Sequence, residues 1–510
     1  EILTIFKMAL SGLVFYAYMR IMGASKCASK ITGLAYAFSG WVTWYLWFNH
    51  FTGVAIAFPL ILLGLEYVFR KKNPLILISS VCLIGFVNFF FMFCYVLCAL
   101  FYGVFRYLQT FKTRSKKDNL ISLLLMIAGF AVGILLPMMV VLPSVMYSIS
   151  SPKASTGGYF HYLVNALKNG DLKKFFELLI SWSAITNNAQ NNARALYPFI
   201  EFIFPVTSCR GTPLTVYGME TYDNMAGSFY CFMPMLLLLF PAFRNSLKQK
   251  HYSVIIPLVF FIFALFTPCF YYLFFGFTSG YSRWTLFVVT SILAFSGKYL
   301  DEIKKEDNII VLIESTAILI ILILIGAFAA QIIVSKYGEY YKERFPIWAA
   351  ALIQMLYLII LTTVLVLVKY RKKVGFYWFF TGFLATEISI MGALVIHGHG
   401  VENYILVNNG LNANNILCEL ANKTRKTDNS FYRSYSSLID STTPNDGMRN
   451  GYNGISTFHS LYNYNTADFS NWSSVFDNTA PMSWSGSYIQ KRINVDTLLG
   501  VKYYYILDNY

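Results

Sequence analysis

The sequence has few charged residues and lacks the short motifs of soluble catalytic domains. Of its 510 residues, 13% are charged, about half the share of roughly 25% found in an average soluble domain. It contains no Walker A sequence, no G-x-S-x-G elbow and no H-E-x-x-H pair. These absences argue against an ATP-driven transporter, an α/β-hydrolase and a zinc protease. No C-x-x-C spacing occurs among the eight cysteines, so the sequence does not indicate a thiol redox or zinc centre.

Apolar residues are abundant instead, and they occur in blocks. They make up 56% of the chain, and many blocks have the length of about 20 residues that a helix needs to cross a bilayer. This pattern predicts an α-helical polytopic membrane protein with about 11–12 transmembrane helices. The candidate spans are 4–21, 30–47, 51–69, 75–90, 92–108, 121–144, 226–243, 253–274, 282–297, 308–334, 346–368 and 374–397.

Basic residues mark one alternating set of connecting segments. About half of the 40 Lys and Arg residues lie in six segments, 20–30, 70–72, 106–117, 244–250, 298–305 and 369–373. Loops rich in Lys and Arg stay in the cytoplasm, which fixes the orientation of the spans between them. The formal charge of +15 is therefore explained by topology, and we expect membrane lipids as partners and no nucleic acid.

This topology divides the chain into four parts. We expect a first transmembrane block of about six spans (1–144), an extracytoplasmic loop (145–225), a second block of about six spans (226–398) and an extracytoplasmic domain (399–510). Residue 1 then lies outside, so at least one span and part of an outer loop are expected upstream of Glu1. The last part is rich in Asn, Ser, Tyr, Thr and Gly and has short β-prone runs, which predicts a mostly β or mixed soluble domain that the chain truncates.

The outer loop contains a pattern of its own. Residues 159–182 predict two short amphipathic helices that are broken at Gly170, with Asp171 as the N-cap of the second. Such helices either lie flat in the headgroup region of the bilayer or pack onto the membrane domain as a lid.

Acidic residues inside apolar spans need partners, because charge is costly in hydrocarbon. Glu66 precedes Arg70 by four residues, which predicts a local salt bridge on one helix face. Glu314 is expected to make a polar contact between helices. Glu387 has no basic residue four positions away, so it either joins a polar site or forms a hydrogen bond to another helix.

Two basic residues at the outer ends of spans are candidates for substrate binding. Arg283 follows a Gly- and Ser-containing turn in FFGFTSGYSRW, and its planar guanidinium is suited to a phosphate or pyrophosphate group. The alternative is that it anchors the interface beside Tyr281 and Trp284. Lys7 lies in the outer third of the first span, where it either extends to the interface or contacts an anionic lipid head.

Four further polar residues lie at outer turns. Asn49 and His50 occupy the first short outer turn, and His50 is a candidate base or an ordinary interfacial histidine. Glu220 and Asp223, in GMETYDN, precede the seventh span, where carboxylates bind a sugar hydroxyl or a metal, or are solvated. A divalent cation is thus the one cofactor left open, and no metal-ligand set is assigned.

Several segments resemble the YfhO family of bacterial membrane proteins. LAYAFSGWVTWYLWFNHF (34–51), IAFPLILLGLEYVFRKKNP (56–74), FVNFFFMF (86–93) and FFGFTSGYSRW (274–284) are similar to its transmembrane part. NGYNGISTFHSLYN (450–463) and LLGVKYYY (498–505) are similar to segments of its extracellular domain. These six segments span nearly the whole chain in the order expected for the family.

The resemblance implies a glycosyltransferase of the GT-C type in the bacterial cytoplasmic membrane. Such an enzyme moves a sugar from a polyprenyl-phosphate carrier to an extracytoplasmic cell-envelope polymer such as teichoic or lipoteichoic acid. The family's acidic general base lies in the first outer loop, which our topology places upstream of Glu1, so no catalytic residue is assigned in this chain. The resemblance also aligns Arg283 with the family's Arg-Trp position, which strengthens its assignment to the lipid phosphate, with help from Lys7.

Two other functions remain open at this stage. A flippase or transporter of lipid-linked sugars also needs many spans, although the sequence shows no repeated halves and a flippase needs no large outer domain. A non-enzymatic envelope scaffold would use the outer loop and the C-terminal part for binding alone.

Overall fold

The computed structural model describes residues 2–46, 49–111, 114–149, 159–185, 189–204, 206–207, 214–216, 219–221, 229–248, 252–277, 280–305, 309–336, 341–343, 346–370, 375–398, 404–436, 446–454, 457–459, 484–486 and 493–505. The chain divides into two compact units. The first comprises Glu1–Val141 and Tyr159–Gly400, and the second comprises Leu142–Gly158 and Val401–Tyr510.

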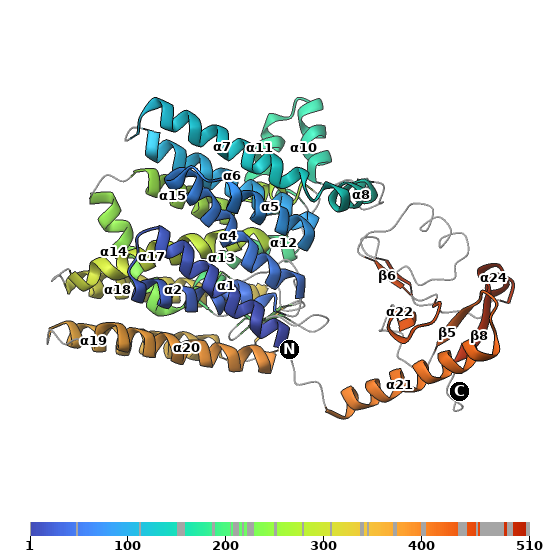
Figure 1. Cartoon of the computed structure of the whole chain (residues 1–510). Coiled ribbons are helices and arrows are strands. Elements are labelled where there is room, and N and C mark those ends of the chain that lie inside the picture. Colours follow the sequence, from blue (N-terminus) through green and yellow to red (C-terminus); the bar gives the residue numbers. More distant parts are fainter. Residues whose placement is uncertain are drawn as a thin grey trace. The chain divides into compact units, whose positions relative to one another are not determined.

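The N-terminal part of the first unit is a group of helices, with a further helix, α8, continuing from it (Figure 1). The helices are α1 (Ile2–Ile21), α2 (Lys26–Ala37), α3 (Gly40–Trp44), α4 (Asn49–Lys71), α5 (Leu75–Val87), α6 (Phe89–Phe111), α7 (Lys116–Leu135) and α8 (Met138–Ile149). α1 packs on α2 and α4, and α4 forms a hairpin with α5.

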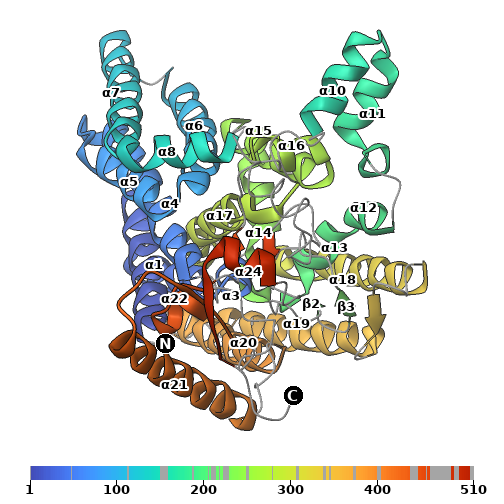
Figure 2. The same cartoon turned by 90° about the vertical axis from the view of Figure 1, so that its right-hand side faces the viewer.

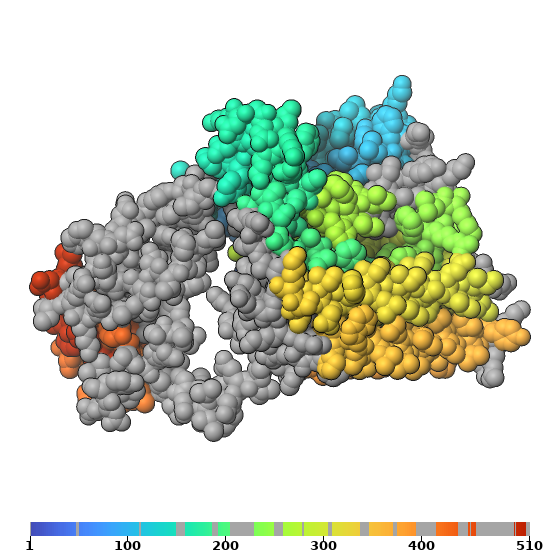
Figure 3. Space-filling view, turned by 180° about the vertical axis from the view of Figure 1, so that it is seen from behind, coloured from blue at the N-terminus to red at the C-terminus, as the bar shows by residue number. Residues whose placement is uncertain are grey.

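The second group completes the same unit and packs against the first through α2, α6, α15 and α17. It consists of α14 (Met233–Lys248), α15 (Tyr252–Phe266), α16 (Pro268–Leu273), the 3₁₀ turn η2 (Ser282–Thr285), α17 (Leu286–Lys305), α18 (Ile310–Lys336), α19 (Ile347–Tyr370) and α20 (Phe376–Gly398). In Figure 3 the yellow band of α18 lies directly beside the orange band of α19 and α20.

The expected fold class is confirmed: the chain is a helical polytopic membrane protein. In the described residues, six helices are long and apolar enough to cross a bilayer, namely α1, α4 from His50, α6, α7, α18 and α19. Their outer faces expose large apolar side chains, for example Leu13, Leu124, Ile321 and Ile360. A soluble helix would bury such a face or replace it with polar residues.

Four of the sequence ranges predicted as continuous spans are interrupted in the structure. The range 30–47 breaks at Phe38–Ser39, 75–90 at Asn88, 121–144 at Leu136–Pro137, and 253–274 at Thr267. Thr267 is extended because the following proline disfavours the helical conformation of the residue before it. Pro137 has no N–H to continue the helical hydrogen bonds. Hydrophobicity predicted the location of these segments but not their breaks.

Close helix contacts depend on glycine at a few positions. A Cβ on Gly12 of α1 would lie 2.8 Å from the carbonyl oxygen of Gly33 on α2, and a Cβ on Gly33 would lie 2.7 Å from the oxygen of Gly12. The two backbones therefore touch, as at the small-residue interfaces of membrane helices.

A buried polar network joins three helices at the basic end of the bundle. The Glu66 side chain on α4 has no exposed surface, and its carboxylate accepts hydrogen bonds from Arg70 Nε (2.8 Å) and Arg106 Nε (2.6 Å). It also accepts one from the Tyr102 hydroxyl (2.7 Å), which itself accepts one from Tyr18 of α1 (3.1 Å). The predicted Glu66–Arg70 pair is confirmed, and Arg106 from α6 extends it between helices.

The other two intramembrane acids also have partners. Arg244 of α14 forms a salt bridge with Glu314 of α18, which confirms the predicted contact between helices. Glu387 of α20 is buried and accepts hydrogen bonds from the Tyr230 hydroxyl and from the backbone N–H of Met233 (3.1 Å). Of the two alternatives for Glu387, the structure therefore shows the hydrogen bond to another segment.

The connection between the two helix groups contains short helices and part of a small sheet. The helices are α10 (Tyr159–Lys168), α11 (Leu172–Ile180), the 3₁₀ turn η1 (Trp182–Ala184), α12 (Ala189–Arg194) and α13 (Tyr197–Ile203). Strands β1 (Val206–Thr207), β2 (Leu214–Val216), β3 (Met219–Thr221) and β4 (Tyr341–Glu343) form an antiparallel sheet in that order. β4 comes from the α18–α19 connection, so this sheet joins two segments that are far apart in sequence.

The second unit contains both helices and strands. Its described elements after residue 400 are α21 (Tyr404–Thr427), β5 (Arg433–Ser436), α22 (Asp446–Asn450), β6 (Thr457–His459), β7 (Trp484–Gly486), α24 (Ile493–Leu499) and β8 (Val501–Tyr505). β5 pairs in parallel with β8, and Ser434 of β5 also forms a bridge with Gly454. The segments NGYNG (450–454) and VKYYY (501–505), which both resemble the extracellular domain of the YfhO family, therefore pair with opposite edges of β5.

Asp428 ties the end of α21 to β8. Its carboxylate accepts hydrogen bonds from Lys502 Nζ, the Tyr503 hydroxyl (2.8 Å) and both the N–H and hydroxyl of Ser430 (2.9 and 2.6 Å). These donors, with Lys502 first, hold the pKa of Asp428 well below its usual range. Because the ionised form is favoured in the folded state, this contribution to stability is present above the unfolded pKa of about 3.9 and is lost as the pH falls through the folded pKa.

We therefore expect Asp428→Asn to destabilise the second unit at neutral pH, and we expect the difference from wild type to shrink as the pH falls below about 4. Hydrogen exchange of the amides in β5 and β8 over a pH series measures this. Glu419→Gln is the matched control, because Glu419 is an exposed carboxylate on the same helix. A constant difference between Asp428→Asn and wild type at all pH values would contradict the assignment.

Candidate functional site

Three helices begin at the end of the bundle opposite the Glu66 network. Lys7 lies in the second turn of α1, His50 in the first turn of α4, and Arg283 in the turn that leads into α17. The Arg283 guanidinium lies 5.1 Å from the ring centroid of Phe51, the residue after His50, and α1, which contains Lys7, packs on α4. These contacts place the three basic groups at the same end of the bundle. Sequence analysis proposed each of them separately, and the structure brings them together.

The backbone at Arg283 is fixed by two other helices. The turn before it contains Gly276 and Phe277 at φ +56° and +61°, and the 3₁₀ turn η2 then carries Arg283 into α17. The Arg283 carbonyl accepts hydrogen bonds from Trp41 Nε1 of α3 (2.9 Å) and from the Tyr95 hydroxyl of α6. A rigid backbone holds the side chain in a defined place, which binding of a specific ligand requires.

The Arg283 guanidinium lies among aromatic rings. It is 4.3 Å from the ring centroid of Tyr281, 5.1 Å from that of Phe51 and 5.9 Å from that of Phe275. In the described part of the chain, no carboxylate forms a salt bridge with it. The rings orient the guanidinium by cation–π contact and leave its N–H groups available to an anion. The predicted neighbour Tyr281 is therefore part of this site.

Two buried donor groups beside this turn have no acceptor in the described residues. They are Trp284 Nε1 and Trp182 Nε1. The ring of Tyr271 lies 5.5 Å from Trp284 and 5.1 Å from Trp182, in edge-on contact with both. A buried donor without an acceptor costs about 1–3 kcal/mol. Such groups therefore favour the entry of an oxygen-rich ligand.

Sequence analysis missed a buried carboxylate in this neighbourhood. Glu201 of α13 is 3% exposed. Its charge acts on the hydroxyls of Tyr45 and Tyr271. The charge of Arg283 also acts on Tyr45, and that of Arg194 also acts on Tyr271. The signal was present, since Glu201 is the one charged residue in the apolar run 199–204. The run lies in the predicted outer loop, however, and acidic residues stand out from sequence only inside predicted spans.

The short helices of the connecting segment, including α13 with Glu201, are packed on the membrane helices. α13 contacts α18, and Gln354 of α19 donates to the carbonyl of Ile203 (3.1 Å). α10 and α11 project from the bundle next to α16 (Figure 2). Their break at Gly170 and the Asp171 cap, which accepts from the N–H of Lys174 (2.8 Å), are confirmed.

Of the two arrangements considered from sequence for the α10–α11 hairpin, the structure shows the packing on the membrane helices. Tyr159 stacks on Tyr272 of α16 at 4.2 Å and donates to the carbonyl of Leu178, and burial raises the pKa of the Tyr159 hydroxyl. The hairpin is therefore docked on the bundle. It also exposes a row of large apolar side chains, which suits contact with lipid: Phe160, Leu167, Leu172, Phe176 and Ile180.

The structure corrects the places of several predicted site residues. Asn49 and His50 were predicted to occupy an outer turn, but they are the first two residues of α4. Glu220 is not in a loop either: it lies in strand β3, paired in register with Thr215 and Lys342. Asp223 lies outside the described residues. The described residues contain no group of three His, Cys, Asp or Glu that could hold a metal ion.

Comparison with known proteins gives one match. A family model described as "Bacterial membrane protein YfhO" matches residues 1–176 and 170–509. No curated protein and no solved structure matches the chain.

Proposed function

The chain belongs to the YfhO family of bacterial membrane proteins, and from this premise we propose that it is a glycosyltransferase. Its donor is a sugar carried on polyprenyl phosphate, and its acceptor is a cell-envelope polymer such as teichoic or lipoteichoic acid. The observation that supports this most strongly is the group formed by Lys7, His50 and Arg283, which lies at one end of an apolar helix bundle.

The positive group suits the phosphate of the donor. Arg283 and Lys7 supply charge, and the N-termini of α4 and α17 add the positive ends of two helix dipoles. A lipid-linked donor keeps its hydrocarbon chain in the bilayer, so its phosphate lies at the level of helix ends. The site is in that position on α1, α4 and α17.

In the proposed reaction, an acceptor hydroxyl attacks the anomeric carbon of the sugar. The bond from that carbon to the phosphate oxygen breaks, and the electron pair leaves with the phosphate. Arg283 and Lys7 stabilise the charge that develops there, and such stabilisation is the largest single contribution a site of this kind makes. The hydroxyl proton passes to a carboxylate, which must lie within hydrogen-bond reach.

One carboxylate near this site is a candidate on the acceptor side. Within the described residues, Glu201 is the buried acid whose charge acts on the same tyrosine hydroxyl as Arg283. We assign Glu201 to orienting the acceptor hydroxyl, and the unmatched donors of Trp182 and Trp284 to sugar oxygens.

The proposal also fixes an orientation. The basic ends of the helices face the cytoplasm, so the Arg283 end faces outward in the bacterial cytoplasmic membrane. The C-terminal unit then meets the polymer on the outside, and the α10–α11 hairpin guides the isoprenoid chain.

The test is transfer of radiolabelled sugar from a polyprenyl-phosphate donor to isolated envelope polymer, with membranes that carry the full-length protein. Label in the polymer supports the transferase. Label that changes leaflet without a polymer product would replace it with the flippase, and no movement of label would favour the scaffold.

In the same assay we expect Glu201→Gln to lower kcat/KM for the acceptor about a hundredfold, while KM for the donor stays unchanged. The substitution keeps the size of the side chain, so a purely structural role would alter both substrates together. Glu314→Gln on α18 is the control, because it removes a half-exposed carboxylate that has no role in the proposed transfer. Equal rates for Glu201→Gln and Glu314→Gln would remove Glu201 from the mechanism.

A further inference from the structure

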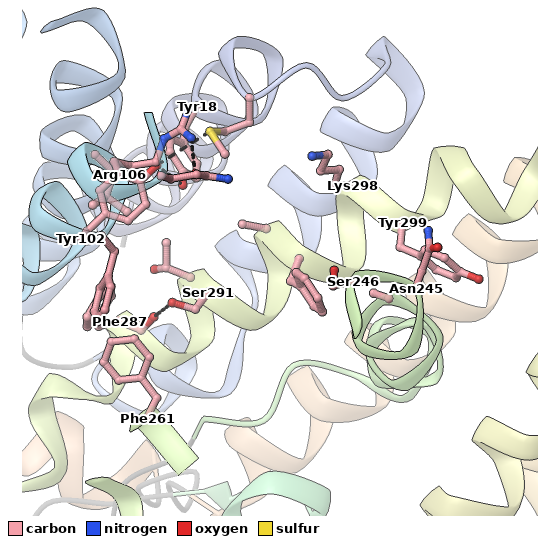
Figure 4. Close-up of a pocket in the computed structure, with 18 of the residues that line it drawn as sticks. Tyr18, Tyr102, Arg106, Asn245, Ser246, Phe261, Phe287, Ser291, Lys298 and Tyr299 are labelled. Carbon is pink, nitrogen blue, oxygen red and sulfur yellow. Dashed lines mark hydrogen bonds between the residues drawn. The ribbon is translucent and has the colours of Figure 1, made fainter. Parts of the chain in front are cut away.

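A second site lies at the basic end of the bundle, away from Arg283. Here residues of α1, α4, α6, α14, α15 and α17 line a cavity of about 290 Å³, close to the lower limit of roughly 300 Å³ for small-molecule sites. Figure 4 shows Arg106 with Tyr18 and Tyr102 on one side and Lys298 on another, with Phe261 and Phe287 together at a third.

The polar part of the cavity has positive charge available to a ligand. Arg70, Arg106 and Lys298 line it, and Glu302 is the one acidic residue in the lining. The carboxylate of Glu66 binds Arg106, so this cation already has a partner. The carboxylate of Glu302 accepts a hydrogen bond from Asn245 (2.6 Å). In the described residues, the Lys298 ammonium has no carboxylate within salt-bridge distance and Arg70 is bound to Glu66 only through Nε. Lys298 Nζ and the two Nη groups of Arg70 can therefore bind an anion.

The deeper part of the cavity is apolar and ends at the layer beneath the Arg283 site. Leu62, Phe261 and Phe287 line this part. Phe287 contacts Phe261 at 4.3 Å and Phe58 at 5.7 Å, and Phe58 contacts Tyr95 at 4.8 Å. Tyr95 donates to the Arg283 carbonyl, so one layer of rings separates the two sites.

A cavity with cations at its polar part and aromatic rings in its depth matches an amphiphile with an anionic head. We propose that it binds a phosphate-headed lipid from the leaflet at the basic end of the bundle, with the phosphate at Arg70 and Lys298 and the start of the hydrocarbon chain against Phe261 and Phe287. Basic pockets between helices on the cytoplasmic side of membranes bind anionic lipid heads in this way. This site is independent of the proposed sugar transfer.

The test is lipid binding to the purified full chain in detergent, measured by displacement of a fluorescent phosphatidylglycerol. We expect Lys298→Gln to weaken binding about tenfold, which corresponds to about 1.4 kcal/mol, because it removes one charge-assisted hydrogen bond. Lys30→Gln is the matched control, since Lys30 is exposed near the same end of the bundle but does not line the cavity. Ala294→Trp, which fills the cavity and keeps its charges, is expected to weaken binding as well, and its melting temperature checks that it folds.

The competitors distinguish the source of the phosphate. Displacement by unlabelled phosphatidylglycerol assigns the site to a membrane phospholipid, and stronger displacement by polyprenyl phosphate assigns it to the carrier lipid; both support the proposal. Equal displacement by inorganic phosphate, or by phosphatidylcholine, would overturn it, because the chain or the negative head would then be irrelevant. Equal binding by Lys298→Gln and Lys30→Gln would also overturn it.

Discussion

Replacement of Arg283 with alanine is expected to lower the rate of sugar transfer about a hundredfold to a thousandfold. The guanidinium is held beside Tyr281 and Phe51 by a backbone that Trp41 and Tyr95 fix, so no other cation can replace it without rearranging the site. The loss is expected in kcat as well as in kcat/KM, because charge on the phosphate increases as the sugar leaves. Steady-state kinetics with a polyprenyl-phosphate donor in membranes measure both constants.

Two variants distinguish this role from simple anchoring at the interface. Arg283→Lys keeps the charge but loses the planar geometry, so it is expected to recover only part of the activity. Lys117→Ala removes an exposed charge at the start of α7 and is expected to leave the rate unchanged. If Arg283→Ala is present in the membrane at the wild-type level and transfers sugar at the wild-type rate, the phosphate assignment is wrong.

Local sequence predicted the individual parts of the site well. The Gly-rich turn before Arg283 predicted an irregular segment at the start of a helix, and the structure has left-handed residues there at Gly276 and Phe277. Gly170 and Asp171 likewise predicted the break and the cap of the α10–α11 hairpin. These features depend on a few neighbouring residues, so a short stretch of sequence contains the information.

Features that depend on packing between distant segments could not be predicted in the same way. Arg106 reaches Glu66 across 40 positions, and the sheet joins β3 to β4 across more than a hundred. Glu201 is buried because α13 packs on α18. An apolar run of sequence predicts that a helix is buried in lipid or in protein. It does not predict which helices lie next to it, or that a cavity forms between α6, α14 and α17.

The second large effect is expected at the Glu66 network. Glu66→Ala leaves Arg106, whose side chain is only 15% exposed, without its carboxylate, and also removes the acceptor of the Tyr102 hydroxyl. Loss of one partner from a buried ion pair costs about 3–5 kcal/mol. We therefore expect the free energy of unfolding, measured by denaturant titration in detergent micelles, to fall by that amount.

The control for this prediction is another salt bridge between helices of the same bundle. Arg244 lies four residues before the end of α14 and Glu314 in the second turn of α18, at the basic end of the bundle, and they are 44% and 46% exposed. Ion pairs exposed to water at the helix ends contribute about 0–1 kcal/mol, so Glu314→Ala is expected to have little effect. The double variant Glu66→Leu with Arg106→Met removes both buried charges and is expected to recover most of the lost stability, because no uncompensated charge remains inside the protein. Equal losses in the free energy of unfolding for Glu66→Ala and Glu314→Ala would show that burial does not determine how much the Glu66 network contributes to stability. A double variant as unstable as Glu66→Ala would show that the hydrogen bonds of Tyr102 and Tyr18, rather than the charges, hold α1, α4 and α6 together.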